Sequence, residues 1–351
     1  MNSAGLSPYD RLQTMAASCR RILTATRGLF FCALLLGVMA PPIWGRVKVE
    51  KVAYFNQPNC YKLSNGTVEV IVTTDIGPRV IRYSFAGGEN ILAELPDTAP
   101  HDSNKWKPWG GHRLWTAPEE MPRSYSPDNS PIQYQIEGDA IRLTQPVEPQ
   151  TGIQKEIHVT LDAEGTGVTI LHRITNRNLW AIDVAPWALT IMNGGGVTIL
   201  PQEPFRAHGV GSFLPERPLA LWAYTDLSDP RWTIGKKFIR LRTDARMEQA
   251  QKIGIANKQG WAAYYRHGTL FIKRFAYQEG ATYPDYGCNT ETFTSGSFME
   301  VETLAPMHRL EPGQSAEHTE RWYLFRDVSL GADEDSIERA IKPLLAQTTL
   351  K

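Results

Sequence analysis

Cysteine, an excess of charge of one sign and long apolar runs are all scarce in this 351-residue sequence. Lys plus Arg and Asp plus Glu both number 37, so the formal net charge is zero. Nucleic-acid binding needs clustered positive charge, and this sequence offers no such cluster. The hydrophobic content of 42% is nevertheless enough to bury a substantial core. The sequence therefore predicts a globular protein that does not bind nucleic acid.

One uncharged apolar run, within residues 28–42, follows Arg20, Arg21 and Arg27. Its length of about a dozen apolar residues is short for a membrane span but suits the hydrophobic part of a secretory signal. Prolines stand where such a signal would be cleaved. We therefore expect residues 1–45 to be either a signal peptide or an uncleaved membrane anchor, and the protein to be exported to the periplasm or secreted.

Two of the four cysteines lie in this leader, which leaves Cys60 and Cys288. An oxidising compartment would permit a disulfide between them. Two separate buried thiols are the alternative, and the sequence leaves both open.

The signatures of several enzyme classes are also missing. The sequence has no Gly-x-Ser-x-Gly, no His-Glu-x-x-His and no zinc-type spacing of cysteine and histidine. The three glycines at 194–196 lack the spacing of a phosphate-binding loop. We expect neither an organic cofactor nor a resident metal.

From residue 47 onward, polar and apolar residues alternate with a period of two, and Gly, Pro, Asn and Asp interrupt the pattern. This pattern is typical of half-buried antiparallel strands. Amphipathic segments between the strands are lacking, which argues for stacked antiparallel sheets and against a parallel α/β sheet. Strands are predicted within residues 66–75, 79–87, 89–95, 132–146, 153–176, 180–192, 237–244, 252–277, 298–310 and 318–328.

One helix is predicted near the C-terminus, capped by Asp333 or Asp335, with Ile337 and Ile341 on its apolar face. Pro343 is expected to limit its length. No linker or change in composition divides the remaining chain. The predicted organisation is one all-β domain at residues 46–330, followed by a short helix and tail at 331–351.

Three stretches resemble the galactose mutarotase-like superfamily, which includes the aldose 1-epimerases. Residues 73–92 are similar to its early strand pair with a Gly-x-Arg turn, and residues 174–192 to its central segment after a Thr-Asn turn. Residues 298–325 are similar to its closing strands, which end in a Glu-x-Trp strand. With residues 110–119 and 283–293, they look most like a branch apart from the true aldose epimerases. The resemblance implies a β-supersandwich with a sugar-sized cleft and a carbohydrate ligand.

In the epimerases that this sequence resembles, a Glu on a late strand acts as base at the anomeric centre, opposite an acid. The matching strand here contains Glu300 and Glu302, and strand alternation puts both on one face. Repulsion between two carboxylates raises the proton affinity of at least one. We predict Glu302 as the base, with Glu300 as a second choice for that role and a substrate-binding residue. The alternative is the solvated face of an ordinary strand.

The histidine of the epimerases' central segment is missing, because Pro186 and Trp187 occupy the comparable place. Trp187 can stack on a sugar but cannot carry a proton. We therefore predict that His112, in the "GGHRLW" stretch, supplies the acid. Glycines 110–111 would let backbone and ligand come close. His172 is more typical of a structural histidine.

Arg113 and Trp115 from the same stretch are predicted to bind and stack on the sugar. In the alternative, His112 is hydrogen-bonded in a loop, Arg113 pairs with Glu119 or Glu120, and the tryptophans belong to the core.

Further substrate-binding candidates come from other segments. Asn289 and Glu291 would hold sugar hydroxyls or a hard cation, unless they serve ordinary turn chemistry. Arg79 from the Gly-Pro-Arg turn would reach the site, unless it forms a surface ion pair. Glu119 is a further carboxylate candidate.

Three functions follow from these residues. The first is an enzyme at or near the anomeric carbon, with Glu302 as base and His112 as acid. The second is a non-catalytic carbohydrate-binding module. The third is a glycoside hydrolase or lyase that uses paired carboxylates such as Glu119 and Glu302. The first requires Glu302 and His112 to face each other across a gap the width of one sugar.

Overall fold

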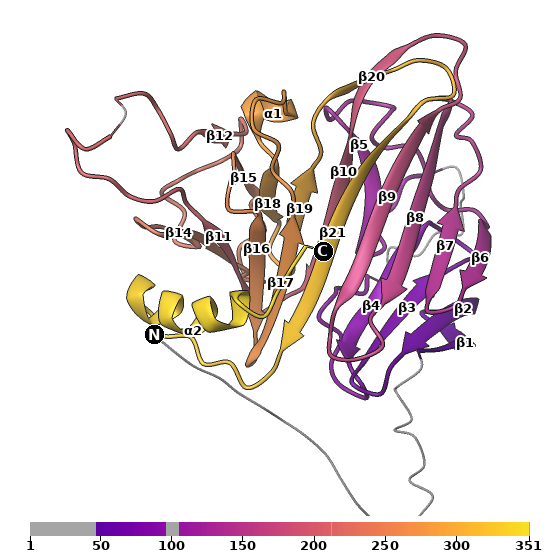
Figure 1. Cartoon of the computed structure of the whole chain (residues 1–351), viewed down its shortest axis with the longest axis horizontal. Coiled ribbons are helices and arrows are strands. Elements are labelled where there is room, and N and C mark those ends of the chain that lie inside the picture. The colour runs from indigo at the N-terminus through magenta and orange to yellow at the C-terminus, as the bar shows by residue number, and fades with distance from the viewer. Residues whose placement is uncertain (1–46, 96–104, 212, 351) are drawn as a thin grey trace, which may run out of the picture. The chain divides into compact units, whose positions relative to one another are not determined.

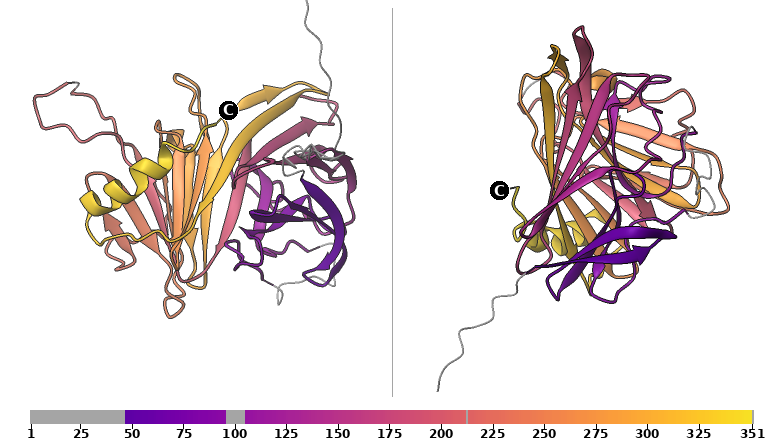
Figure 2. Two further views of the ribbon diagram at one scale, coloured as in Figure 1. Left: turned by 60° about the horizontal axis from the view of Figure 1, so that its bottom comes forward. Right: turned by 90° about the vertical axis from the view of Figure 1, so that its right-hand side faces the viewer.

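The computed structural model describes residues 47–95, 105–211 and 213–350, so the predicted leader at residues 1–45 lies outside the described residues. The described chain forms two large antiparallel sheets that pack against each other (Figures 1 and 2). The predicted all-β fold of stacked antiparallel sheets is confirmed. Of the helices that the structure describes, none has the length and apolar character that crossing a bilayer requires.

The eleven-stranded sheet contains, in spatial order, β1 (Lys48–Tyr54), β2 (Gln57–Ser64), β3 (Val68–Thr73), β4 (Arg79–Phe85), β5 (Gly111–Ala117), β10 (Ile182–Asn193), β19 (Phe298–Leu304), β18 (Thr290–Thr294), β15 (Gln251–Ile255) and β12 (Leu219–Leu221), with β20 (His308–Leu310) paired to β10. The ten-stranded sheet contains β13 (Trp232–Ile234), β14 (Phe238–Arg242), β11 (Val197–Pro201), β16 (Trp261–Arg266), β17 (Thr269–Phe275), β21 (Ser315–Phe325), β9 (Val168–Asn176), β8 (Ile153–Leu161), β7 (Ala140–Thr144) and β6 (Gln133–Glu137). Sequence-adjacent strands pair as hairpins at β6 with β7 and at β8 with β9, as the turn residues predicted.

One predicted strand, at residues 89–95, is wrong. This segment makes only isolated bridges, at Leu92 and Glu94. The Asn90 side chain takes the place of the ladder, because its Oδ1 accepts hydrogen bonds from the backbone N–H groups of Tyr83 and Leu92, both at 3.1 Å. A side-chain amide that substitutes for backbone pairing in this way ends regular strand structure.

The main core lies between the two sheets. Leu114 and Val301 of the eleven-stranded sheet belong to the same buried cluster as Ile170, Phe271 and Trp322 of the ten-stranded sheet. Strand β10 contacts β9 and β21 across this interface, and the three run side by side in Figure 1. Removal of these side chains from water provides the main driving force for packing the sheets together.

Strands β5 and β10 differ from the rest because both of their faces are buried. Strand β8 alternates between buried and half-buried residues, whereas β5 is buried at every residue and β10 at most of its length. The face of β5 and β10 that points away from the inter-sheet core is covered by a second apolar cluster, which includes Trp115 and Trp187 with Trp106 and Tyr125 packed against it. An antiparallel sheet commonly leaves one face to solvent, so this covered face marks a special region.

Helix α2 (Glu334–Leu345) lies against the outer face of the ten-stranded sheet (Figure 2). Asp333 caps it by accepting a hydrogen bond from the Ser336 N–H, and Ile337 and Ile341 pack against the sheet, as predicted. Pro343 was expected to limit the helix, but it lies inside it, and the helix continues to Leu345. The helix therefore ends within one turn after Pro343 and not at Pro343 itself.

The two cysteines of the described chain are not joined. Cys60 and Cys288 are both buried free thiols, which corresponds to the second of the two alternatives. Burial raises the pKa of the Cys60 thiol to about 11 and that of the Cys288 thiol to about 12. Both are therefore uncharged and unreactive near neutral pH.

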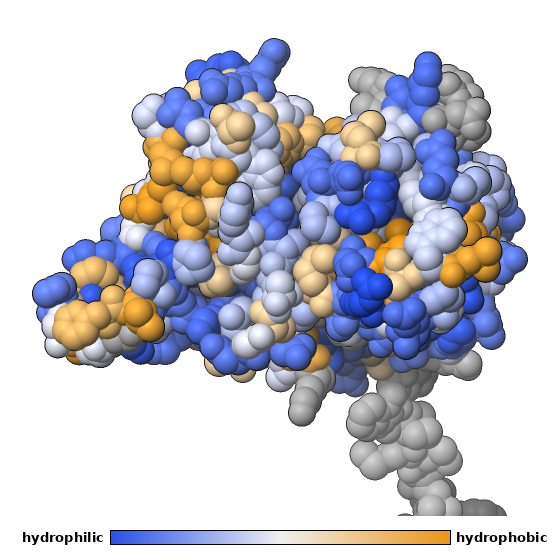
Figure 3. Space-filling model, turned by 90° about the horizontal axis from the view of Figure 1, so that it is seen from above, coloured by the Kyte–Doolittle hydropathy of each residue, from blue (hydrophilic) through white to orange (hydrophobic). Residues whose placement is uncertain are grey.

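The exposed surface is mixed. Figure 3 shows separate groups of apolar residues among polar ones on one face. Several exposed apolar side chains lie in the segment between β11 and β12, which extends away from the sheets at the left of Figure 1. They are Phe205, Val210, Phe213 and Leu214.

Candidate functional site

A cavity of about 600 Å³ opens on the face of the eleven-stranded sheet that points away from the inter-sheet core. Strands β5, β10, β15, β18 and β19 contribute to it. Its aromatic lining consists of Trp106, Trp115, Tyr125, Trp187, Trp222, Tyr224, Phe293 and Phe298. Its charged lining consists of Arg113, Glu119, Lys252 and Glu300. The structure thus brings Arg113, Trp115, Trp187, Glu119 and Glu300 together, all of which were predicted for one site.

The predicted acid and base, however, lie on opposite faces of the sheet. On β10, Leu189 stands opposite both Arg113 and Glu302, whereas the next residue, Thr190, stands opposite His112. Successive strand residues point to opposite faces, so Glu302 points to the cavity side and His112 to the inter-sheet core. The predicted pairing of Glu302 with His112 across one sugar is therefore not present.

Glu302 is fully buried beneath the cavity wall, so it is not the solvated strand face of the alternative reading. Its Oε2 accepts hydrogen bonds from Trp187 Nε1 at 2.8 Å and from Lys252 Nζ at 3.1 Å. Glu291 forms a second ion pair with Lys252, at 2.8 Å. The rings of Trp187 and Trp222 hold the ammonium from two sides, with each centroid 4.6 Å from Nζ.

Lys252 organises this buried cluster. Burial lowers its pKa, but the carboxylates of Glu291 and Glu302 outweigh burial and hold the pKa of Lys252 well above its usual value. Lys252 therefore stays charged, and Glu302 serves mainly to neutralise it. The ammonium occupies the place between the two carboxylates where a hard cation would otherwise bind.

Glu300 differs from Glu302 because it is only half-buried and lines the cavity. It lies two residues before Glu302 on the same face of β19. Burial, and then the Glu302 carboxylate, raise the pKa of Glu300 to about 8, against the opposing effects of Lys252 and Arg113. Glu300 therefore carries a proton in a large fraction of molecules near neutral pH and can exchange it with a ligand.

Asn289 and Glu291, predicted to bind the substrate, are both buried, and neither lines the cavity. Burial raises the pKa of Glu291 and also of Asp285, which belongs to the short turn α1 (Pro284–Gly287). Asn289 is buried and bonded to the backbone of Asn257, accepting from its N–H at 2.7 Å and donating to its carbonyl at 3.0 Å. Asn289 therefore holds two loops together and does not reach the cavity.

Arg113 is clamped between two tryptophans. Its guanidinium carbon lies 5.2 Å from the centroid of Trp106 and 5.3 Å from that of Trp115. Its Nη2 donates to Asp128 Oδ1 at 3.0 Å, so its carboxylate partner is this aspartate and neither of the glutamates of the alternative reading. Arg113 thus links the rings of Trp106 and Trp115 along one wall of the cavity.

Arg79 supports this wall from behind. It is fully buried, and its Nη2 donates to the other oxygen of Asp128 at 2.9 Å. Its Nη1 donates to the carbonyls of Gly110 and Pro108, at 2.6 and 3.0 Å. Arg79 is not among the residues that line the cavity, so its contacts give it a positioning role and not the predicted substrate contact.

Gly110 and Gly111 serve the chain's own backbone. Both have positive φ, and a Cβ on Gly110 would lie 2.1 Å from the Ala93 carbonyl oxygen. A Cβ on Gly111 would lie 2.3 Å from the Val80 carbonyl oxygen. The close approach predicted for a ligand is taken by neighbouring backbone.

Trp222 and Tyr224 form another part of the wall and follow β12. Two hydrogen bonds attach this segment to β15: Thr225 Oγ1 donates to the Lys252 carbonyl, and the Asp226 N–H donates to Gln251 Oε1 at 3.0 Å. The wall segment is thus fixed beside the Lys252 ammonium that it covers.

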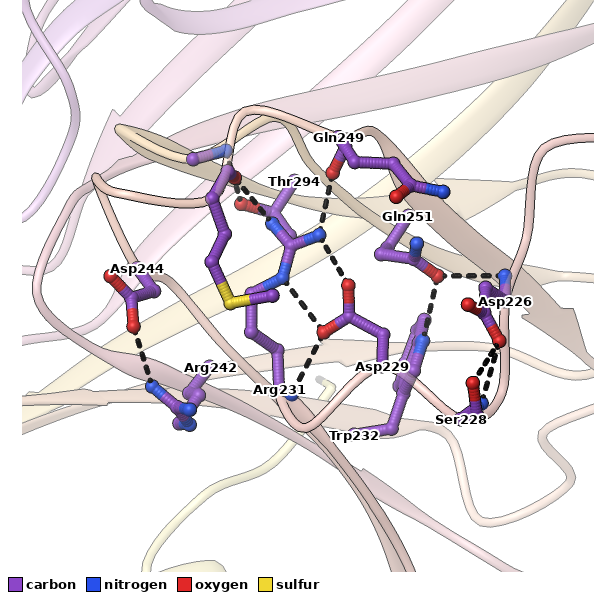
Figure 4. A network of polar contacts seen from close by, with 12 residues as sticks. Asp226, Ser228, Asp229, Arg231, Trp232, Arg242, Asp244, Gln249, Gln251 and Thr294 are labelled. Atoms are coloured by element: carbon purple, nitrogen blue, oxygen red, sulfur yellow. Dashed lines mark hydrogen bonds and ion pairs between the residues drawn. The ribbon is translucent and has the colours of Figure 1, made fainter.

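A buried polar network continues this attachment (Figure 4). The Arg231 guanidinium makes two hydrogen bonds to Asp229, at 3.0 and 2.8 Å, and its Nη1 donates to the Met247 carbonyl at 2.9 Å. Gln251 Oε1 also accepts from Trp232 Nε1 at 2.9 Å. These bonds connect the wall segment, which carries Trp222 and Tyr224 and continues to Trp232, to the loop before β15.

Glu119 and Tyr125 lie at the rim of the cavity. Glu119 is exposed and accepts a hydrogen bond from the Tyr125 hydroxyl. Burial, and then this bond, raise the pKa of Tyr125. Among the residues that the structure describes, Glu119 has no cationic partner within ion-pair distance.

His112 belongs to a separate polar network between the two sheets. Its Nε2 lies 2.6 Å from Nε2 of His172, and its Nδ1 lies 2.8 Å from the hydroxyl of Thr190. Lys273 Nζ donates to Thr190 Oγ1 at 2.6 Å and pairs with Glu320 at 2.9 Å. His172, expected to be structural, is indeed buried here.

The partners decide the tautomers of these histidines. His172 Nδ1 faces the His318 carbonyl at 2.9 Å and must carry a hydrogen, so a neutral His172 accepts at Nε2. His112 then donates from Nε2 and accepts at Nδ1 from Thr190. Burial lowers the pKa of His112 and His172, and lowers that of His318 to about 3, so all three are neutral.

The donor set of His112, His172 and Glu320 has ligand atoms within 4.8 Å of one another, which would suit a metal ion. The Glu320 carboxylate, however, already accepts hydrogen bonds from Lys273, Thr303 and Trp322. The histidine nitrogens are equally engaged. A metal would have to displace the Lys273 ammonium, so the arrangement fits a satisfied structural network better than a metal site.

Lys252 and several aromatic residues of the site were not predicted from the sequence. The aromatic ones are Trp106, Tyr125, Trp222, Tyr224, Phe293 and Phe298. For Lys252 the sequence offered one signal, a lysine beside the apolar residues of "QKIGI", because lysine is rarely fully buried unless it is paired. The first four aromatic residues lie in irregular segments, where periodicity assigns no face, whereas Phe293 and Phe298 lie on strands.

No family model matches the sequence, and no curated protein matches it. Solved structures do resemble the fold. A galactose mutarotase-like protein from Lactobacillus casei superposes with a TM-score of 0.52 at 12% identity, over 76% of this chain and all of that one. A TPR-domain containing protein from Parabacteroides distasonis superposes with a TM-score of 0.52 at 15% identity, and this chain, 78% of which is covered, spans about half (48%) of it. The chain therefore has the galactose mutarotase-like fold that its motifs indicated.

Proposed function

We propose that the protein binds a carbohydrate in the cavity over β5, β10 and β19 and exchanges a proton with it through Glu300. The observation that carries the proposal is the composition of the wall, where a proton-bearing carboxyl stands among rigid aromatic rings. Aromatic faces stack on the apolar faces of sugar rings, and a few polar groups orient the ligand. The cavity volume of about 600 Å³ lies in the ordinary range for small-ligand sites.

The proposed chemistry takes place at the anomeric centre. Ring opening needs an acid that protonates the ring oxygen and a base that accepts the proton of the anomeric hydroxyl. Glu300 in its protonated form supplies the acid, and the Glu119 carboxylate on the rim supplies the base. The two groups exchange roles when the ring closes on the other face. Glu302 takes no part in this scheme, because it is buried and bound to Lys252 and Trp187.

A non-catalytic carbohydrate-binding protein is the second candidate. It is favoured by one observation: among the described lining residues there is no histidine, and both cations of the lining are already paired. Such a site would bind a sugar and leave its anomeric composition unchanged.

The first experiment is a thermal-shift screen of mono- and oligosaccharides, followed by NMR measurement of anomer exchange. A sugar that binds only the native state raises the melting temperature. We expect Glu300→Gln to keep sugar affinity within about threefold and to slow anomer exchange by about 100-fold or more. Retained binding with no exchange by the unaltered protein would favour the second candidate. If no sugar raised the melting temperature, the proposed function would be lost altogether.

A further inference from the structure

The cations and the carboxyl groups around the cavity differ in whether they already have a partner of opposite charge. From each element packed against Glu300, the titratable and charged groups are Arg113 of β5, Glu119 and Tyr125 of the segment after it, Tyr224 of the wall segment, Lys252 of β15, Asp285 of α1, Glu291 of β18 and Glu302 of β19. Four of these are carboxyl groups and two are cations, and Glu300 adds a fifth carboxyl. Carboxyl groups therefore outnumber cations around the cavity.

Both cations already pair with carboxylates of the protein. Lys252 pairs with Glu291 and Glu302, and Arg113 pairs with Asp128. The Lys252 ammonium cannot pair with a phosphate or carboxylate on a ligand without breaking a buried ion pair, which is costly, and the Arg113 side chain is only 2% exposed. The lining thus disfavours anionic sugars.

The carboxyl side is not neutralised. Among the described residues, Glu300 and Glu119 form no ion pair within 4 Å, and Oε1 of the fully buried Glu302 has no hydrogen-bond partner. A carboxylate oxygen that is buried without a donor is costly, so an additional donor at this place is favourable. Glu302 itself lies beneath the cavity wall, so the carboxyl groups that a ligand can reach are Glu300 and Glu119.

The aromatic rings of the cavity wall indicate which kind of ligand group they attract. Two pairs of tryptophan rings each hold a cation of the protein itself, Lys252 in one pair and Arg113 in the other. Rings in this arrangement are attractive to positive charge. The rings of Tyr125, Phe293 and Phe298 line the same cavity, and within the described ranges of the chain no cation lies over any of them.

We infer that the ligand of this cavity is a sugar that carries a free amino group, with its ammonium bound at Glu300, and not a sugar phosphate or uronate. The inference rests on the proposed carbohydrate binding in its non-catalytic form and narrows its ligand class, because a Glu300 carboxylate paired with an ammonium has no proton to give to the ring oxygen. When the ammonium binds to a protonated Glu300, the carboxyl loses its proton to the solvent. One proton is therefore released for each ligand that binds in this way. No covalent bond changes.

The test is isothermal titration calorimetry at about pH 6.5, where a sugar amine is largely protonated. The probes are glucosamine, N-acetylglucosamine, glucose, glucuronate and glucose 6-phosphate, each at the same ionic strength. Measurements in two buffers with different ionisation enthalpies give the number of protons released. We expect glucosamine to bind about tenfold more tightly than N-acetylglucosamine and to release protons.

Glu300→Gln should remove both the preference for the amine and the proton release while leaving the binding of glucose within about threefold. The matched control is Glu164→Gln, which changes an exposed carboxylate in the turn between β8 and β9 and should leave both unchanged. Equal binding of the neutral and amino sugars, or tighter binding of glucuronate or the phosphate, would overturn the inference and leave the carbohydrate function intact. Failure of every sugar to bind would remove both.

Discussion

Glu300 and Glu302 are two residues apart on one face of β19, yet their carboxyls have different environments. Glu302 accepts hydrogen bonds from Lys252 and Trp187, which stabilise its anion. Glu300 has no donor of this kind and faces the Glu302 charge, so it holds a proton instead. The Lys252 ammonium binds Glu302 directly, and Glu300 is the carboxyl whose pKa is raised to about 8.

This difference predicts a pH dependence of stability. The pKa of Glu300 is raised from 4.5 to about 8 on folding, so between these values the folded state binds more protons than the unfolded state. The stabilisation is complete below pH 4.5 and is lost as the pH rises through 8. Glu300→Gln should therefore reduce the fall in the free energy of unfolding between about pH 5 and 8, by up to about 1.4 kcal/mol per pH unit. Urea unfolding at several pH values measures it, and an unchanged slope would contradict the assignment.

At the scale of elements, the site depends on segments that are not regular strands. The wall segment with Trp222 and Tyr224 is held to β15 by side-chain hydrogen bonds and not by a long ladder. The buried pair of Arg231 and Asp229 fastens the same segment to the loop before β15 (Figure 4). This anchoring keeps Trp222 against Lys252 and the cavity closed on that side.

Arg231→Met should loosen this wall. The substitution leaves the buried Asp229 carboxylate unpaired, which typically costs about 3–5 kcal/mol. We expect a lower melting temperature, faster hydrogen exchange in residues 222–231 and weaker sugar binding. The matched control is Arg246→Met, because the Arg246 side chain is 88% exposed and pairs with Asp244 at the surface. That change should stay within about 0.5 kcal/mol. Unchanged exchange in residues 222–231 of Arg231→Met would show that the pair is not the anchor.

At the scale of the whole molecule, a polar network joins the two sheets through their shared core. Lys273 and Glu320 belong to the ten-stranded sheet, while Thr190, Thr303 and His112 belong to the other. Glu320 is stabilised as an anion by Lys273 and by hydrogen bonds, although burial alone would raise its pKa. Such a network, when every member is satisfied, favours one register of the sheets over others.

Acid should disrupt this network. Burial lowers the pKa of His112, His172 and His318, so below about pH 6.5 the unfolded state takes up protons that the folded state excludes. Stability is full above that pH and is lost as the pH falls, by up to about 1.4 kcal/mol per pH unit for each histidine.

The test compares denaturant unfolding between about pH 4.5 and 7.5 in the unaltered protein and in His318→Gln. The variant keeps a side-chain donor for Thr303 and should show a shallower slope below about pH 6.5. His267→Gln is the control, because the His267 side chain is 62% exposed and should leave the slope unchanged. A slope in His318→Gln as steep as in the unaltered protein would contradict the assignment.

Local sequence patterns were sufficient to predict much of this structure. Period-two alternation placed most strands and put Glu300 and Glu302 on one face, and the turn residues placed the hairpins at β6–β7 and β8–β9. The capping aspartate and apolar spacing placed α2. These features depend on residues close together in the chain, where backbone geometry alone sets which side chains share a side.

The pairing of strands into sheets decided which face of each strand is turned toward the cavity. His112 and Arg113 were predicted for one site, but they are neighbours on β5 and must point to opposite faces. Alternation within a strand cannot say which face meets the core, and only the pairing with β10 does. Lys252, 50 residues from Glu302 in the chain, and the separate burial of Cys60 and Cys288 likewise follow from long-range contacts. The sequence by itself thus determined the fold class and the chemistry available on each strand, while the tertiary structure decided which of those side chains share a cavity.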